Sequence, residues 1–294
     1  MLYRDFATQA EIDAQYHVSL RRPDYAEVER RMAELSAGVR RDHPAARLGV
    51  RFGATLSEHL DVFCAGAPEA GGPRPVLVFI HGGYWRAGNA ADWSLVATGP
   101  NAHGIDVAVT NYTLAPAASI DEITRQSRAA VAWLHAHAAE WGGDPNRIHV
   151  AGHSAGGHLT AMVLATDWAG DYGLPADLVK GGVPLSGLYD LRPFPYSYLA
   201  PALQLSRRTV ETQSPLLLPV DPARAHVPRI VAWGGGETDE FVRQSRAYAA
   251  HCRAAGIEVR ELPLGADDHF DAVLQLADPD SELTRAITEH VSLR

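Results

Sequence analysis

Ser154 has the sequence context of a catalytic nucleophile. It is the centre of the segment GHSAG at residues 152–156, which directly follows the apolar run 148–150. In such a nucleophile elbow a strand ends, the chain turns sharply through the serine, and a helix begins. Glycines suit both flanks of the serine because neighbouring backbone must pass close by. The pattern therefore predicts a strained strand-to-helix turn with Ser154 as the attacking group.

A second glycine motif, HGGYW at residues 81–85, follows the apolar run 76–80. A loop of this kind beside a nucleophilic serine supplies backbone N–H groups that stabilise the negative charge developing on the substrate oxygen. We expect the donors to be the N–H groups of Gly83, Tyr84 and Ala155, with Gly82 shaping the loop. Each motif alone is a weak signal, but both directly follow β-like runs, and this pairing favours a serine hydrolase.

A nucleophilic serine needs a base within hydrogen-bond reach, and the base needs an acid that orients it. On elbows of this kind the chain order is serine, acid, histidine. His269 follows the last predicted strand, residues 259–264, and is therefore the expected base. Asp267 and Asp268, which directly precede it, are expected to serve turns. His135 and His137 point to different helix faces, which does not suit a metal site. We expect neither a metal nor a cofactor.

The acid is expected directly after the predicted strand 229–233. The segment GGGETDE at residues 234–240 offers three carboxylates there. Glu237 comes first after the glycines and is the preferred acid, whereas Asp239 is the alternative. Glu240 is expected to place negative charge in the first turn of the next helix.

Strands and helices alternate along most of the chain. Runs typical of buried strands lie at residues 76–80, 106–110, 148–150, 182–185, 229–233 and 259–264. Helical patterns lie between several of these runs: one is capped by Ser119 with Glu122, and a closing helix is expected at 281–293. Asp144-Pro145-Asn146 predicts a turn. The alternation predicts one α/β domain, residues 1–294, with a mostly parallel sheet and helices on both faces.

Two segments lie outside this alternation. Residues 1–45 predict an N-terminal helical extension, with an amphipathic helix at 24–41. Its expected capping box is Asp24 with Glu27, and its apolar face is expected to comprise Val28, Met32, Leu35 and Val39. Residues 189–227, rich in prolines, aromatics and charges, are expected to form a cap over the site. The Pro/Gly-rich residues 65–75 predict a connecting loop.

The bulk composition excludes several classes of protein. The 294 residues are 46% hydrophobic and 21% charged, which is ordinary for a globular enzyme. The net charge of −9 argues against nucleic acid or an anionic membrane as partner. The start of the chain lacks the pattern of a secretory signal, so we expect a cytoplasmic protein acting on a small molecule, and a homodimer is left open. Cys64 and Cys252 are expected to be buried, reduced thiols.

Aromatic residues near the motifs and in the insertion could line the substrate pocket, since ligand sites favour aromatic walls. The candidates are Trp85, Tyr189, Phe194, Tyr196 and Tyr198. The alternative is that most of them pack the cap onto the sheet.

The motifs together resemble a known family. The set HGGYW (81–85), GHSAGGHL (152–159), SGLYDL (186–191), EFVRQS (240–245) and DHFD (268–271), with EIDAQY (11–16), is similar to the arylformamidase branch of the hormone-sensitive-lipase-like α/β-hydrolases. The resemblance implies the α/β-hydrolase fold and hydrolysis of N-formylkynurenine to kynurenine and formate. It makes Ser154 the nucleophile, His269 the base and Glu237 the acid, although the family more often has Asp at that last position.

Two other functions remain open at this point. The same chemistry would serve a carboxylesterase for short acyl or aryl esters. A non-catalytic ligand-binding protein of this fold is a remote alternative, because such proteins commonly lose a member of the triad and all three candidates are present here.

Overall fold

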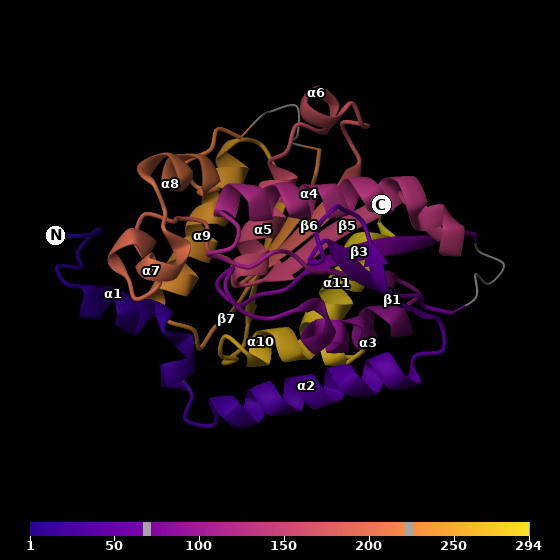
Figure 1. Ribbon diagram of the computed structural model, residues 1–294, viewed down its shortest axis with the longest axis horizontal. Coiled ribbons are helices and arrows are strands. Elements are labelled where there is room, and N and C mark those ends of the chain that lie inside the picture. The colour runs from indigo at the N-terminus through magenta and orange to yellow at the C-terminus, as the bar shows by residue number, and fades with distance from the viewer. Residues whose placement is uncertain (67–71, 221–225, 294) are drawn as a thin grey trace.

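The computed structural model describes residues 1–66, 72–220 and 226–293, and a single eight-stranded sheet forms its centre (Figure 1). Parts of the predicted loop 65–75 and of the insertion 189–227 therefore lie outside the described residues. The strands are β1 (Ala46–Arg51), β2 (His59–Phe63), β3 (Arg74–Ile80), β4 (Asp106–Thr110), β5 (Gly143–His153), β6 (Val179–Leu185), β7 (Arg229–Gly234) and β8 (Val259–Leu264).

The strand order is β1-β2-β4-β3-β5-β6-β7-β8. Strands β3 to β8 pair in parallel, whereas β1 pairs antiparallel with β2, and β2 with β4. The predicted α/β fold with a mostly parallel sheet is confirmed. Strand β3 lies between β4 and β5 and pairs in parallel with both. The loops after β3 and β5 therefore leave the same edge of the sheet side by side.

Helices cover both faces of the sheet. The helices are α1 (Gln9–Tyr16), α2 (Tyr25–Asp42), α3 (Thr98–Ala102), α4 (Ile120–His137), α5 (Ala155–Leu164), α6 (Trp168–Tyr172), α7 (Ala200–Leu203), α8 (Arg207–Gln213), α9 (Asp239–Ala254), α10 (Asp271–Leu274) and α11 (Glu282–Ser292). Helices α4 and α5 lie on one side, and α2, α3, α10 and α11 on the other (Figure 1). None of the helices in the described residues is both long and apolar enough to cross a membrane.

The alternation of β3 shows how the sheet separates two cores. Val76, Val78 and Ile80 join the cluster that contains residues of α4 and α5. Leu77 and Phe79 join the cluster that contains residues of α2 and α11. Successive side chains of a strand point to opposite faces, so a strand buried on both faces must be apolar throughout. This is why the run 76–80 contains no polar residue.

Helix α2, predicted at residues 24–41, differs in detail from its prediction. Asp24 makes no capping hydrogen bond to α2, and its carboxylate instead accepts one from Arg22. Leu35 is 38% exposed, whereas Ser36 is buried. Ser36 can occupy the buried position because its hydroxyl donates to the carbonyl oxygen of Asp92 and accepts from the N–H of Leu95. These two bonds tie α2 to the 3₁₀ segment Ala90–Ala97.

Two other local predictions need correction. The predicted turn at residues 144–146 lies inside β5, where pairing with β3 jumps from Gly143 to Ile148. Its turn chemistry survives within that irregularity, since the Asn146 N–H donates to the Asp144 carboxylate. Only half of the capping box before α4 forms: Ser119 accepts from the Glu122 N–H, but the Glu122 carboxylate binds other side chains.

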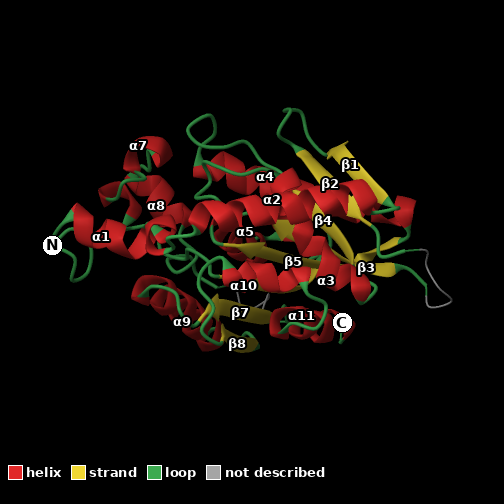
Figure 2. Ribbon diagram, turned by 90° about the horizontal axis from the view of Figure 1, so that it is seen from below, coloured by secondary structure: helices red, strands yellow, loops and turns green. Residues whose placement is uncertain are grey.

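Figure 2 shows the first part of the N-terminal extension at the same end of the molecule as the insertion, with α1 beside α7 and α8, whereas α2 runs along the molecule. Figure 1 gives the same placement. The Asp13 carboxylate of α1 accepts from the Tyr198 N–H of the insertion at 2.8 Å. The two segments outside the alternating pattern are therefore neighbours.

Gly156 provides a test of the packing between α5 and β3. A Cβ added there would lie 1.9 Å from the carbonyl oxygen of Ile80. We expect Gly156→Ala to lower the free energy of unfolding by about 3 kcal/mol or more, because backbone must move to admit the methyl group. Urea unfolding measures this.

Gly38→Ala is the matched control. Gly38 lies inside α2, where an added Cβ would come no closer than 3.9 Å to another side chain. Helix propensity then favours alanine by up to about 1 kcal/mol. A Gly156→Ala protein as stable as the wild type would contradict the close contact.

Candidate functional site

Ser154 lies at the sharp turn that the glycine spacing predicts. Strand β5 ends at His153 and α5 begins at Ala155, and Ser154 between them has φ 58° and ψ −117°. Its N–H donates to the carbonyl oxygen of Leu185 at 2.9 Å. A Cβ at Gly152 would lie 2.4 Å from the backbone oxygen of Gly156, so the turn admits no larger residue there. A left-handed φ at a serine costs on the order of 1–3 kcal/mol, which the surrounding packing must offset.

The loop after β3 has an unusual backbone conformation. Gly83, Tyr84 and Trp85 have successive φ values of 108°, 50° and 58°. The carbonyl oxygen of Gly83 accepts from the N–H groups of Arg86 and Ala87, each at 3.0 Å. Within the described part of the chain, the N–H groups of Gly83 and Tyr84 have no recorded acceptor. They are thus available to a bound anion.

Ala155 supplies a third N–H of the same kind. As the first residue of α5, it has no acceptor within its own helix. The positive end of the helix dipole adds to its attraction for negative charge. The three N–H groups named from the sequence thus lie on the loop after β3 and at the start of α5.

His269 and Glu237 are in direct contact. The Nδ1 atom of His269 lies 3.1 Å from Oε1 of Glu237, and the two side chains are only 6% and 1% exposed. Phe241 packs against the imidazole with ring centres 4.5 Å apart. Asp239, the alternative acid, is exposed as the first residue of α9. Of the two carboxylates, only Glu237 contacts His269.

Backbone contacts bring the acid and the histidine together. The Gly236 N–H donates to the carbonyl oxygen of Asp267 at 2.9 Å. A Cβ at Gly235 would lie 2.0 Å from the carbonyl oxygen of Gly265. The loops after β7 and β8 therefore pack backbone to backbone. Asp268 serves the turn, as expected. Its carboxylate accepts hydrogen bonds from the backbone N–H groups of Phe270 and Asp271.

Ser154 and His269 line a single cavity of about 580 Å³. Gly82, Gly83 and Tyr84 line it too. Among the described residues no hydrogen bond joins the Ser154 hydroxyl to the His269 imidazole. No group of three or more His, Cys, Asp or Glu residues in the described part of the chain is arranged to hold a metal ion. The cavity thus brings together a hydroxyl group, an imidazole paired with a carboxylate, and free backbone donors.

Only one of the five predicted pocket aromatics lies on the cavity wall, and that one is Tyr198. Trp85, Tyr189 and Phe194 are fully buried in the core, and Tyr196 is 45% exposed outside the cavity lining. Trp85 donates its indole N–H to His158, and Tyr189 stacks on Tyr248 with ring centres 4.2 Å apart. The alternative, that most of these rings pack the insertion onto the sheet, therefore describes three of the five.

The N-terminal extension supplies wall residues that the sequence did not indicate. They include His17, Tyr25, Glu29, Arg30 and Met32. Trp93 and Phe270 add two further rings. The amphipathic pattern predicted α2 but not what its side chains face, because periodicity shows only that one side is covered. The resemblance of residues 11–16 to the arylformamidase branch was the one sequence signal that tied this segment to function.

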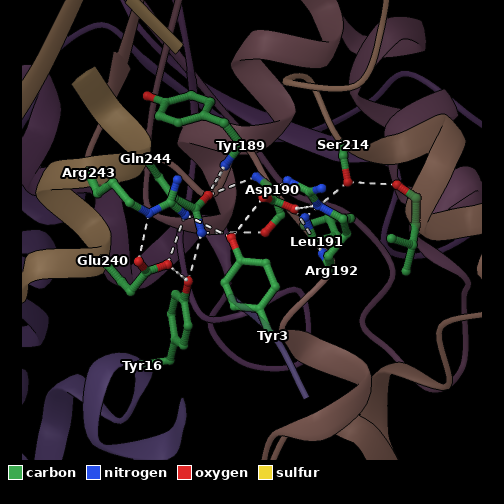
Figure 3. Close-up of polar contacts among 11 residues, drawn as sticks. Tyr3, Tyr16, Tyr189, Asp190, Leu191, Arg192, Ser214, Glu240, Arg243 and Gln244 are labelled. Atoms are coloured by element: carbon green, nitrogen blue, oxygen red, sulfur yellow. Dashed lines mark hydrogen bonds and ion pairs between the residues drawn. The ribbon is translucent and has the colours of Figure 1, made fainter. Parts of the chain in front are cut away.

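Figure 3 shows how polar contacts anchor the extension. The Tyr3 hydroxyl donates to the Asp190 carboxylate at 2.8 Å, and the Tyr16 hydroxyl donates to Glu240 at 2.8 Å. Arg243 of α9 bonds both Glu240 and the Tyr3 hydroxyl. Burial raises the pKa of Asp190, but hydrogen bonds from Arg192 and Tyr3 outweigh burial and hold this pKa below its usual value. The network joins the extension to the base of the insertion and to the helix that follows Glu237.

Three buried histidines surround the two loops. Burial lowers the pKa of His81 and of His158 to about 4, and lowers the pKa of His153 well below its usual value. His153 donates from Nε2 to the carbonyl oxygen of His269 at 2.8 Å. His158 donates from Nε2 to the carbonyl oxygen of Gln213 at 2.7 Å. All three imidazoles are neutral in the folded protein at pH 7.

Comparisons with known proteins agree with this geometry. Residues 77–270 match a family described as having the alpha/beta hydrolase fold. A kynurenine formamidase of Danio rerio is 28% identical over 265 residues, covering 88% of this chain and 87% of that protein. A carboxylic ester hydrolase, LipN, of Mycobacterium tuberculosis is 30% identical, covering 76% of this chain and 66% of that protein. The resemblance inferred from the motifs is confirmed.

A solved structure is similar over nearly the whole length. The crystal structure of a protein from Silicibacter sp. TM1040 superposes with a TM-score of 0.81, covering 95% of this chain and 99% of that chain, at 29% identity. Only about 5% of this chain is left out, which is less than the length of the N-terminal extension or of the insertion. The expected fold is thus supported over nearly the whole chain.

The buried histidines predict a dependence of stability on pH. The unfolded chain protonates a histidine near pH 6.5, whereas folded His81 and His158 stay neutral down to about pH 4. The unfolded state therefore binds more protons in this window, and stability falls as the pH falls through it. We expect a loss of about 1.4 kcal/mol per pH unit for each such histidine. Urea unfolding at pH 7, 6 and 5 measures the slope.

His158→Gln is the control variant for this slope. Its amide can still donate to the carbonyl oxygen of Gln213, and one titrating group is removed. The slope between pH 6 and pH 5 is expected to be shallower by the contribution of one histidine. An unchanged slope in the variant would contradict the assignment.

Proposed function

We propose that this chain, which belongs to the α/β-hydrolase fold family, is a serine hydrolase with Ser154 as nucleophile, His269 as base and Glu237 as acid. The observation that carries the proposal is the 3.1 Å contact between His269 and Glu237 beside a strained Ser154 in one cavity. A carboxylate at Nδ1 fixes the imidazole tautomer and leaves Nε2 to take a proton. In apo enzymes the bond between nucleophile and base is often long and tightens only when substrate binds.

In the first half of the reaction, the Ser154 hydroxyl oxygen attacks the carbonyl carbon of the substrate, and its proton passes to Nε2 of His269. The carbonyl oxygen becomes an oxyanion and accepts hydrogen bonds from the N–H groups of Gly83, Tyr84 and Ala155. The C–N bond then breaks as His269 returns the proton to the leaving amine. The acyl group remains on Ser154 as an ester.

In the second half, water attacks the acyl ester. His269 takes a proton from the water and gives it to the Ser154 oxygen as that bond breaks. Glu237 stabilises the imidazolium in both halves without itself being protonated. An N-formyl substrate thus yields an amine and formate, and the enzyme returns to its starting state.

The substrate class we propose is a small N-formyl or aryl amide, most specifically N-formylkynurenine. The near full-length similarity to a kynurenine formamidase supports it. The cavity of about 580 Å³ falls within the range typical of small-molecule sites, and rings of Tyr25, Trp93, Tyr198 and Phe270 lie on its wall. An aromatic amide matches this lining.

A carboxylesterase for short acyl or aryl esters is the second candidate. It is favoured by the 30% identity to the ester hydrolase LipN. The acyl-enzyme chemistry is the same, because an alkoxide or phenoxide replaces the amine as leaving group. The ratio of kcat/KM for N-formylkynurenine to that for p-nitrophenyl acetate separates the two, and a preference for the ester by several orders of magnitude would favour the esterase.

Replacing the nucleophile is the most direct test. Ser154→Ala is expected to lose about 10⁴-fold or more in kcat on N-formylkynurenine and on p-nitrophenyl acetate, because no acyl-enzyme can form. Wild-type protein should be labelled by a fluorophosphonate probe, and the variant should not. Undiminished turnover in the variant would reject the serine mechanism. Absence of both labelling and turnover in the wild type would favour a non-catalytic ligand-binding protein.

A pair of isosteric variants tests the acid. Glu237→Gln is expected to lower kcat by more than about 100-fold, because an amide cannot stabilise the imidazolium. Asp239→Asn should stay within about twofold of the wild type, since an exposed carboxylate in the first helical turn affects only the stability of α9, by about 0.3–1 kcal/mol. The reverse ranking would move the role of the acid to Asp239.

A further inference from the structure

Arg86 is a cation on the cavity wall that has no carboxylate partner among the described residues. The other arginine on the wall, Arg30, bonds Glu34 at 2.7 Å and lies 3.5 Å from Glu27. The two carboxylates on the wall also have donors of their own: Glu29 accepts from the Tyr25 hydroxyl, and Asp92 accepts from the Asn89 amide. Both of these donors are neutral, so Glu29 and Asp92 keep their negative charges. Of the two arginines on the wall, Arg86 is the one that no carboxylate pairs with among the described residues.

The backbone of Arg86 is fixed next to the reacting groups. Its N–H donates to the carbonyl oxygen of Gly83 at 3.0 Å, and the preceding carbonyl oxygen, of Trp85, accepts from Ala115 at 2.8 Å. Arg86 is two residues after Tyr84 in the chain, and the N–H of Tyr84 is a proposed oxyanion donor. A group held by the Arg86 side chain would lie at a set separation from the carbonyl under attack.

The guanidinium group is held by a ring rather than by an acid. It lies 5.8 Å from the ring centre of Tyr198. Tyr198 stacks on His17 with ring centres 4.3 Å apart, and Asp13 accepts its N–H. A cation over an aromatic ring can keep most of its N–H groups available, because the attraction acts through the face of the guanidinium plane. Arg86 also hydrogen-bonds the Tyr198 hydroxyl: burial raises the pKa of Tyr198, and this bond acts against that rise. The Tyr198 side chain thus orients Arg86 through its ring and its hydroxyl, and no carboxylate among the described residues takes the other N–H groups.

We propose that Arg86 binds a carboxylate of the substrate, so that the site selects acylated aromatic amines that carry a carboxylate away from the bond that is cleaved. This inference rests on the proposed serine hydrolase function and narrows its substrate class. Arginine suits the role because its parallel N–H groups match the two oxygens of a carboxylate. The α-carboxylate of N-formylkynurenine has this placement, whereas p-nitrophenyl acetate has no such group.

The test compares two substrates that differ only in that charge: N-formylkynurenine and its α-carboxamide. In the wild type, kcat/KM should be higher for the carboxylate. In Arg86→Gln, the ratio of the two kcat/KM values should fall about tenfold, through KM rather than kcat, because a hydrogen-bonded charge pair is lost. Arg86→Lys should recover part of the ratio, since it keeps the charge but not the two-pronged geometry.

Arg30→Gln is the matched control. Arg30 lies on the wall of the same cavity and carries the same charge, but its partner is Glu34. Its removal should leave the substrate ratio unchanged. Equal falls for Arg30→Gln and Arg86→Gln would mean that only the general positive potential matters. No fall for Arg86→Gln would overturn the proposal.

A binding experiment separates this proposal from the proposed function. Kynurenine retains the carboxylate and can be titrated into Ser154→Ala protein by calorimetry, with no turnover required. Adding Arg86→Gln to that protein should weaken the binding of kynurenine about tenfold. Unchanged binding would overturn the role of Arg86 even if Ser154 proves catalytic. Weakened binding would support it even if the reaction proves different.

Discussion

The contact between the first turn of α5 and the end of β3 is the constraint on which this site depends. A carbonyl oxygen of β3, that of Ile80, occupies the space where a side chain at Gly156 would begin. The start of a helix thus lies directly against the end of a neighbouring parallel strand. As a result the first turn of α5, which begins at Ala155, lies against the end of β3 and the first residue of the loop that follows it. Glycine at 156 is required by space rather than by its φ angle.

The same kind of contact positions the other half of the site. The loops after β7 and β8 touch through their backbones at Gly235 and Gly265. Because Glu237 follows one loop and His269 the other, this contact brings an acid and a base from distant parts of the chain together. Backbone packing tolerates little adjustment, which suits a reaction that needs fixed donor and acceptor positions. The close backbone contacts at the glycines thus determine where the side chains of Glu237 and His269 lie relative to each other.

The sequence singled out these positions because each depends on a local rule. A serine between glycines after an apolar run, and acids after a glycine run, reflect what a tight turn at a strand end requires of the backbone. The choice between Glu237 and Asp239 was harder, since both follow the same strand. Only the path of the chain into α9 separates them: it turns Asp239 outward and leaves Glu237 against His269.

The cavity wall could not be predicted in the same way. Whether a ring such as Phe194 faces a cavity or the core depends on contacts far apart in the sequence, here its packing on Tyr16 of the extension. Likewise, Ser36 takes a buried place because its partners lie near residue 95. Periodicity identifies a covered face but not what covers it. The structure therefore shows that residues of the N-terminal extension line the cavity, whereas the sequence pattern alone did not.

His153 shows how a second imidazole beside the nucleophile is kept out of the chemistry. Its ring centre lies 4.4 Å from that of His269, and both histidines line the cavity that Ser154 lines. Burial, and the nearby His269, lower the pKa of His153, which keeps it neutral. Its one N–H is committed to the carbonyl oxygen of His269. A charged His153 would oppose the imidazolium that we propose forms on His269, whereas a neutral one fixes the backbone of that residue. The adjacent histidine thus holds the proposed base in place and does not compete with it for the proton.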